Sequence, residues 1–211
     1  MIITTASMKG GVGKTTITIN IAKILSAILI DCDLRQKSAY LKGKEMGITC
    51  TLLPPEKEVD FFEKIKKGSD KDNLIIFDTG GKDTAGSRMA IAVADLVIIP
   101  VNYSSLDKRG LEETLDVIKE LESYGKTVNY KILLSKVDSR SSNFHHAKKE
   151  LEKRGLPHYP FCIGLYQSFA TSIDQNKTVM EMGDTKAKFC MEQLIREIKR
   201  ELFSEQNSDF Y

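Results

Sequence analysis

The stretch that decides the fold is Lys9-Gly10-Gly11-Val12-Gly13-Lys14-Thr15-Thr16, near the start of the sequence. A β-prone run, Ile2-Ile3-Thr4-Thr5, precedes it, and apolar residues with helical spacing follow it. A strand, a glycine-rich loop and a helix in this order are the context of a phosphate-binding P-loop, whose backbone N–H groups and helix N-terminus face phosphate oxygens. The sequence therefore predicts a nucleotide phosphate site at this loop.

Individual positions of the loop have expected roles. Lys14 is expected to reach the β- and γ-phosphates, and the Thr15 hydroxyl is expected to ligate Mg²⁺. The strict pattern G-x-x-x-x-G-K-[ST] is not met, because its first glycine position holds Met8, and a second lysine, Lys9, follows directly. The expected nucleotide-binding residues are Lys9, Gly10, Gly11, Val12, Gly13, Lys14, Thr15 and Thr16.

Short apolar runs alternate with helical patterns along the chain, which predicts an α/β fold with a doubly wound, mostly parallel sheet and helices on both faces. Runs such as Leu96-Val97-Ile98-Ile99 are apolar throughout, as expected of strands covered on both sides. We expect a single domain over residues 1–203 and a polar tail at 204–211. Strands are expected near 1–6, 27–32, 48–52, 73–78, 95–101, 129–135 and 159–163, and helices near 15–25, 56–67, 84–93, 105–124, 143–154 and 185–203.

The junction between the first helix and the second strand is unusually short. The helical apolar pattern continues to Leu25, and Ile28-Leu29-Ile30 is already strand-like. Such a connection normally takes about 2–6 residues. Either the helix ends before Ser26, or residues are missing between Ser26 and Ala27, and we expect the second.

Aspartates follow two of the expected strands. Asp31 and Asp33 end the second strand, and Asp78 ends the run Leu74 to Phe77. The carboxyl ends of strands in such a sheet converge on the ligand crevice, so these acids are expected to face the phosphates. Asp78 is expected to hold Mg²⁺, usually through water. Asp33 is expected to orient or deprotonate an attacking water and is a second candidate metal ligand, while Asp31 supports the site from behind.

These motifs together resemble the deviant Walker A ATPases of the ParA/MinD superfamily, and most of all the short ParA-type partition ATPases. The loop from Lys9 to Thr16 is similar to their deviant Walker A motif, Ile30 to Asp33 to their second acidic motif, and Ile75 to Thr79 to their Walker B motif. The stretch Ala94 to Val101, followed by Leu106-Asp107, is also typical of them. The resemblance implies a P-loop ATPase with ATP and Mg²⁺ as cofactors.

The resemblance also implies a working cycle. Two ATP-bound subunits form a face-to-face homodimer, in which Lys9 of each subunit reaches the phosphates held by the other, as an arginine finger does. Lys9, Lys14 and Asp33 are then the expected catalytic residues. The dimer binds DNA without sequence preference, and a ParB-like or other centromere-binding protein stimulates hydrolysis, so that a plasmid or chromosome is segregated. The implied location is the cytoplasm, in association with the nucleoid.

Charge is distributed unevenly along the chain. Residues 1–123 hold 17 Lys and Arg against 18 Asp and Glu, whereas residues 124–200 hold 14 against 8. A basic second half suggests a polyanionic partner, although solvated helix surface gives the same pattern. The candidate DNA contacts are Lys148, Lys149, Lys153, Arg154, Lys186, Arg196, Lys199 and Arg200.

Two alternative functions remain open. Ser135-Lys136-Val137-Asp138 resembles the element with which GTPases recognise guanine, and this favours a GTPase of the signal-recognition-related class. A MinD-like, membrane-associated positioning ATPase would use an amphipathic last helix. We expect instead that the apolar stripe of that helix packs in the core and that there is no stable membrane anchor. The stripe consists of Ala187, Cys190, Leu194, Ile198 and Leu202.

Composition is ordinary for a globular protein, with 41% hydrophobic and 28% charged residues. The four cysteines are scattered and form no C-x-x-C pair, so the sequence indicates neither a zinc site nor a disulfide framework. A scaffold that binds nucleotide with negligible turnover is the remaining alternative from another class of protein.

Overall fold

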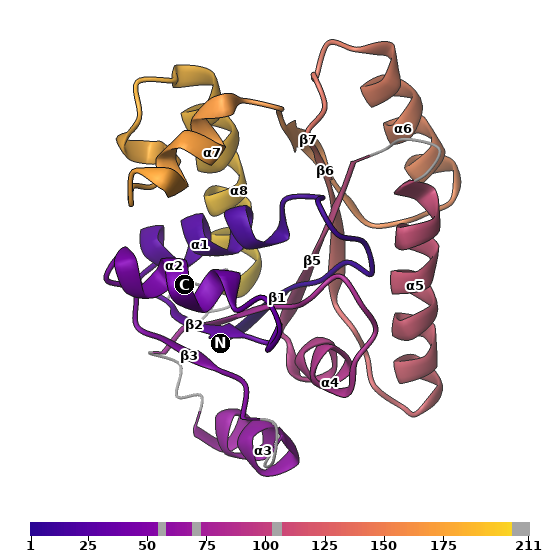
Figure 1. Ribbon diagram of the computed structural model, residues 1–211. Helices are drawn as coiled ribbons and strands as arrows, with labels where there is room; N and C mark the ends of the chain where they lie inside the picture. Colours follow the sequence, from indigo (N-terminus) through magenta and orange to yellow (C-terminus); the bar gives the residue numbers. More distant parts are fainter. Residues whose placement is uncertain (55–57, 69–72, 103–106, 204–211) are drawn as a thin grey trace, which may run out of the picture.

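A single parallel sheet organises the protein. The computed structural model describes residues 1–54, 58–68, 73–102 and 107–203. Within these residues, seven strands lie in the order β3-β2-β4-β1-β5-β6-β7 (Figure 1), and every neighbouring pair is parallel. The strands are β1 (Ile2–Thr5), β2 (Ile28–Asp31), β3 (Cys50–Leu52), β4 (Ile75–Asp78), β5 (Leu96–Val101), β6 (Tyr130–Ser135) and β7 (His158–Ile163).

Helices cover both faces of the sheet, so the predicted doubly wound α/β fold is confirmed. One core cluster joins α1, α2, α7 and α8 to one face, and two further clusters join α3, α4, α5 and α6 to the other (Figure 1). The helices are α1 (Lys14–Ile24), α2 (Ser38–Glu45), α3 (Glu58–Gly68), α4 (Ala85–Val93), α5 (Asp107–Ser123), α6 (Ser142–Lys153), α7 (Gln167–Asp174) and α8 (Thr185–Phe203), with a short 3₁₀ helix at Val179–Glu181.

The central strand β1 places the glycine-rich loop at the middle of the sheet. β1 lies between β4 and β5, where the winding of the chain changes direction, and such a switch point opens a crevice at the carboxyl ends of the strands. Asp78 is paired in register with Thr5 of β1 and with Asp31 of β2. The two aspartates therefore lie at the same level of the sheet, beside the start of the loop.

The junction between α1 and β2 corrects one prediction. The helix ends at Ile24, Ser26 adopts a left-handed conformation with φ of 54°, and the Ala27 N–H donates to the Ala22 carbonyl at 2.9 Å. These are the features of a Schellman turn, which closes a helix and reverses the chain within a few residues. The helix therefore ends before Ser26, and the junction closes without the missing residues that we expected.

Two helices were not predicted from the sequence. Both α2 and α7 are only eight residues long, too short for a helical pattern to repeat over more than about two turns. The predicted tail at 204–211 and Leu106 of the partition-like stretch lie outside the described residues.

Candidate active site

Glycines give the loop between β1 and α1 its shape. Gly11 and Gly13 have φ of 79° and 93°, in the left-handed region that glycine adopts without a steric penalty. Gly13 is the N-cap of α1, so the first turn of that helix faces the same space as the loop. A cleft of about 980 Å³ opens there, lined by Gly10, Gly11, Gly13, Lys14, Thr15 and Thr16 of the loop together with segments 31–36 and 78–82.

Lys14 is held inside the loop rather than in solvent. Its side chain is buried, and its Nζ donates to the Lys9 carbonyl at 2.7 Å. Burial lowers the pKa of Lys14, while the charges of Asp78 and Asp33 act in the opposite direction. The ammonium group therefore lies at the loop with two carboxylates around it, which suits a group that binds phosphate oxygens.

Asp78 joins the end of β4 to the first turns of α1. Its two carboxylate oxygens accept hydrogen bonds from the Thr15 hydroxyl at 2.7 Å and from the Thr18 hydroxyl at 2.9 Å. Burial raises the pKa of Asp78 to about 7, and the Thr15 hydrogen bond offsets part of this effect. A cation beside the carboxylate would favour its charged form. Asp78 and Thr15 supply the oxygen donors that Mg²⁺ prefers, so they fit as the residues that would hold it.

The two aspartates after β2 have different surroundings. Asp31 is fully buried, and its oxygens accept from the backbone N–H groups of Asp33 and Tyr40 at 2.8 and 3.0 Å. These bonds shape the loop into α2, consistent with a supporting role. Asp33 lines the cleft, and its Oδ1 accepts from the N–H groups of Arg35 and Gln36 at 3.2 and 3.1 Å. The second oxygen of Asp33 does not take part in that turn.

The last residue of β6 and the residue after it support the glycine-rich loop, a role that the sequence did not reveal. Ser135 Oγ donates to the Val12 carbonyl at 2.7 Å, and Lys136 Nζ donates to the Gly11 carbonyl at 2.6 Å. Asp138, the residue that would accept from guanine, instead accepts from the Arg140 guanidinium at 3.3 and 3.1 Å. The geometry of this segment thus gives the Ser-Lys pair a structural purpose that does not depend on the base.

The structure gives a steric reason for the glycine pair Gly80-Gly81, which follows Asp78 and Thr79. A Cβ on Gly81 would lie 2.9 Å from the Gly10 nitrogen, which is too close for two atoms that are not bonded. A Cβ on Gly80 would lie 3.3 Å from Asp33 Oδ2. The loop after β4 therefore packs directly against the glycine-rich loop and beside Asp33.

Helix α8 packs in the core, as expected. Ala187, Leu194 and Ile198 are fully buried, and Cys190 and Leu202 are partly buried against the same cluster. No helix in the described part of the chain is long and apolar enough to cross a membrane.

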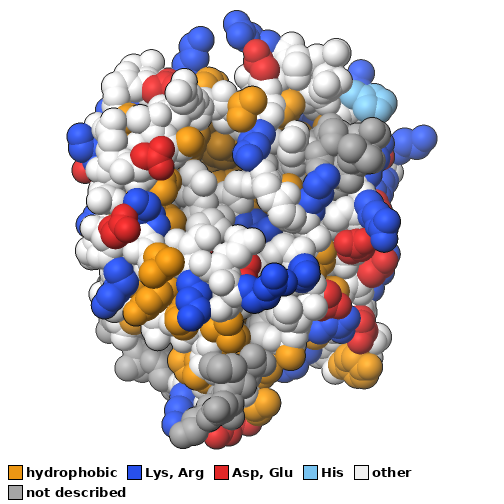
Figure 2. All heavy atoms as spheres, viewed as in Figure 1, with side chains coloured by type: hydrophobic (Ala, Val, Ile, Leu, Met, Phe, Trp, Pro, Cys, Tyr) orange, Lys and Arg blue, Asp and Glu red, His pale blue; other side chains and the backbone are white. Residues whose placement is uncertain are grey.

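The eight candidate DNA contacts fall into two groups. One group lies on or directly after α6 and the other on α8, and these helices cover opposite faces of the sheet. Arg154 forms an ion pair with Glu112, Lys148 with Glu152, and Arg200 with Glu197. On the face shown in Figure 2, Lys and Arg side chains are interspersed with Asp and Glu. The structure does not gather the eight residues on one helix face.

Comparisons with known proteins agree with this geometry. The chain is 24% identical over 185 residues to Maintenance of carboxysome distribution protein A from Gloeobacter kilaueensis, which covers 85% of this chain and 84% of that protein. It is 26% identical over 164 residues to Protein ParA from Rhizobium radiobacter, which covers 74% of each.

Solved structures with the same fold hold nucleotide. A variant of Cyanothece McdA in complex with ATP superposes with a TM-score of 0.77 at 18% identity, over 95% of both chains. MinD from Pyrococcus horikoshii with Mg-ADP superposes with a TM-score of 0.71 at 18% identity, over 94% of this chain and 96% of that one. Both structures therefore show the fold of this chain around a bound nucleotide.

A family model decides the assignment. The model of the CobQ/CobB/MinD/ParA nucleotide binding domain matches residues 3–196, which includes the glycine-rich loop, both acidic strand ends and most of α8. The chain therefore belongs to the CobQ/CobB/MinD/ParA family and, within it, to the ParA/MinD superfamily of ATPases.

Proposed function

We propose that this protein is a Mg²⁺-dependent ATPase that works as a ParA-type partition protein. ATP binding drives a sandwich homodimer, the dimer binds DNA without sequence preference, and hydrolysis to ADP and phosphate, stimulated by a ParB-like or other centromere-binding partner, resets it. The observation that carries this proposal is the convergence of Lys14, Thr15, Asp33 and Asp78 on one cleft beside β1. Its proposed location is the cytoplasm, on the nucleoid.

Each side chain has a proposed role in the cycle. Lys14 binds phosphate oxygens within its own subunit, and Lys9 supplies a second positive charge to the partner subunit. Asp33 orients the attacking water or accepts its proton, because its Oδ1 is anchored to the backbone and the other oxygen is left for the reaction. Mg²⁺, when bound at Thr15 and Asp78, supplies positive charge beside the phosphates.

A second candidate function shares this cycle but has a different cargo. Two relatives, from Gloeobacter kilaueensis and Halothiobacillus neapolitanus, are maintenance of carboxysome distribution proteins, and this chain matches 84% and 86% of their lengths. In this second candidate function the cargo is a carboxysome-like protein body rather than a replicon. Deleting the gene separates the two candidates: a partition protein gives plasmid or chromosome loss, and a positioning protein gives clustered protein bodies without such loss.

Nucleotide-gated DNA binding tests the main proposal. Binding of two unrelated DNA duplexes is measured with ATP and with ADP at low and high salt, together with single-turnover ATP hydrolysis with and without DNA. We expect the protein to bind DNA when ATP is present and not when ADP is present, with similar affinity for the two duplexes. DNA affinity should fall steeply as salt rises, because phosphate contacts release counterions. Equal binding with ADP, or a strong sequence preference, contradicts the proposal. Negligible hydrolysis under all conditions favours the scaffold alternative.

Paired variants identify the DNA surface. Among the described residues, Lys149 and Lys153 on α6 and Arg196 and Lys199 on α8 are exposed and have no ion-pair partner. Replacing one pair by Gln should reduce DNA affinity and lower the salt dependence by about one unit per lost phosphate contact, without changing ATP affinity. Lys119 of α5 and Lys126, which follows that helix, are both replaced by Gln as the control. If neither double variant loses DNA affinity, both helix faces are excluded as the DNA-binding surface.

A further inference from the structure

Lys9 lies in a confined position between two elements that are distant in sequence. A Cβ placed on Gly110 of α5 would lie 2.6 Å from Lys9 Cβ and 3.5 Å from Lys9 Cδ. On the other side, a Cβ on Gly81 would lie 3.3 Å from the Lys9 carbonyl carbon. Contacts under 3 Å are not tolerated between carbon atoms, so α5 leaves room for the Lys9 side chain only because residue 110 is glycine.

Helix α5 also fixes the backbone next to Lys9. The Met8 N–H donates to the Thr114 hydroxyl at 3.0 Å, and that hydroxyl donates to the Gly110 carbonyl at 2.7 Å. Thr114 is fully buried, and Met8 packs in the same core cluster as Leu111 and Leu115. The hydrogen bond thus connects the residue before Lys9 to the turn of α5 that carries Gly110.

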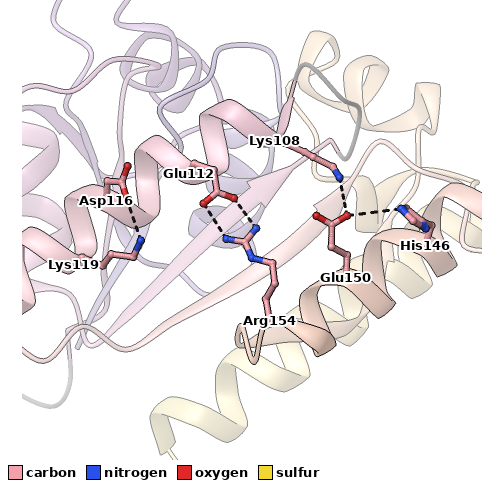
Figure 3. Close-up of polar contacts among 7 residues, drawn as sticks. All are labelled: Lys108, Glu112, Asp116, Lys119, His146, Glu150 and Arg154. Atoms are coloured by element: carbon pink, nitrogen blue, oxygen red, sulfur yellow. Dashed lines mark hydrogen bonds and ion pairs between the residues drawn. The ribbon is translucent and has the colours of Figure 1, made fainter.

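Ion pairs hold this part of α5 against α6. Figure 3 shows Lys108 and Glu112 of α5 facing Glu150 of α6 and Arg154. Lys108 Nζ lies 2.7 Å from Glu150 Oε2, and the Arg154 guanidinium lies 2.6 and 2.9 Å from the two Glu112 oxygens. Gly110 lies two positions from both Lys108 and Glu112, and residues two positions apart on a helix do not share a face. The side of α5 that contacts the glycine-rich loop is therefore not the side that carries the ion pairs. The helix is fixed on more than one side at the level of Lys9.

We propose that Gly110 and Thr114 are positioning residues for Lys9. Thr114 fixes the backbone from which Lys9 projects, and Gly110 supplies the space that its side chain needs, so α5 sets the direction in which Lys9 can reach a second subunit. This inference rests on the proposed function, because it assigns a structural basis to the proposed role of Lys9 in trans. It adds two residues, 101 and 105 positions further along the chain, to the machinery of dimerisation.

A double-mutant cycle tests the packing step without relying on function. Gly110→Ala should lower the midpoint of urea unfolding, although alanine favours the helix over glycine. In the Lys9→Gly background the same substitution should have no such cost, because the atom that it contacts is gone. Gly183→Ala, at a position where a Cβ meets nothing within 4 Å, is the matched control. An equal effect of Gly110→Ala in both backgrounds overturns the proposal.

The functional step is measured by ATP-dependent dimerisation beside ATP affinity of the monomer. Gly110→Ala and Thr114→Val should weaken the dimer by about tenfold or more, since small displacements of a reacting group cost up to about 100-fold, and should change monomer affinity by less than about threefold. Thr114→Ser keeps the hydroxyl and should restore dimerisation. If Gly110→Ala dimerises with ATP as readily as the wild type, the proposal is overturned. If Lys9→Ala also dimerises normally, the proposed function fails instead, and the urea cycle alone decides the packing step.

Discussion

Asp78 shows how one buried carboxylate can serve a cation site. It lies at 2% exposure between two threonine hydroxyls, and burial raises its pKa to about 7. Lys14 nearby has a pKa lowered by the same burial. Burial thus disfavours the charged form of both groups, and a bound nucleotide and its metal would favour the charged forms, because each group then gains a charge partner.

The raised pKa of Asp78 predicts a pH dependence of stability. Between its ordinary value of 3.8 and about 7, the native protein binds more protons than the unfolded chain, so the free energy of unfolding falls as pH rises through this window. The slope is at most about 1.4 kcal/mol per pH unit. Urea unfolding at pH 5.0 and 7.5, without Mg²⁺ or nucleotide, should show this loss in the wild type and a smaller one in Asp78→Asn. Identical slopes would contradict the assignment.

Asp33 carries a separate prediction. Asp33→Asn keeps an Oδ1 that accepts from the N–H groups of Arg35 and Gln36, so the turn and ATP binding should survive. Without a carboxylate to orient or deprotonate water, hydrolysis should fall by about 10²- to 10⁴-fold, and the ATP dimer should persist. Single-turnover hydrolysis and dimer lifetime are the measurements. Wild-type turnover in this variant would remove Asp33 from the mechanism.

At the scale of elements, the sequence predicted best what depends on local patterns. The runs before Asp31 and Asp78 predicted β2 and β4, because strands buried on both faces are apolar throughout. Helix α2, with Gly43 in its middle and few apolar residues, has no comparable pattern. The contact of Lys9 with Gly110 could not be predicted either. Met8 and Thr114 are separated by 106 positions, and only the fold brings their neighbours together.

The turn after α1 gives a prediction at this scale. Ser26 is exposed and left-handed, which costs a residue with a Cβ more than glycine. Ser26→Gly should therefore raise the free energy of unfolding by about 0.5–1 kcal/mol. Ser142→Gly, at the first residue of α6 and with ordinary φ, should instead be neutral or destabilising by up to about 1 kcal/mol. A loss of stability in Ser26→Gly would show that the turn is not strained.

At the scale of the whole molecule, the sheet brings every proposed catalytic group to the carboxyl ends of its central strands. The loop after β1, the aspartate loop after β2 and the glycine loop after β4 line one cleft together with Lys136. Helix α5 and the end of β6 form hydrogen bonds to the glycine-rich loop. The central claim is that ATP in this cleft completes a dimer through Lys9. Dimerisation is therefore the property of the whole molecule that the site should control.

The most direct test is the mass of the wild type and of Lys9→Ala in solution with Mg-ATP and with Mg-ADP, measured by light scattering beside their nucleotide affinities. We expect the wild type to be a dimer with ATP and a monomer with ADP. We expect Lys9→Ala to bind ATP within about threefold of the wild type but to stay monomeric, because the charge supplied to the other subunit is missing. A Lys9→Ala protein that forms dimers with ATP as readily as the wild type would contradict the central claim.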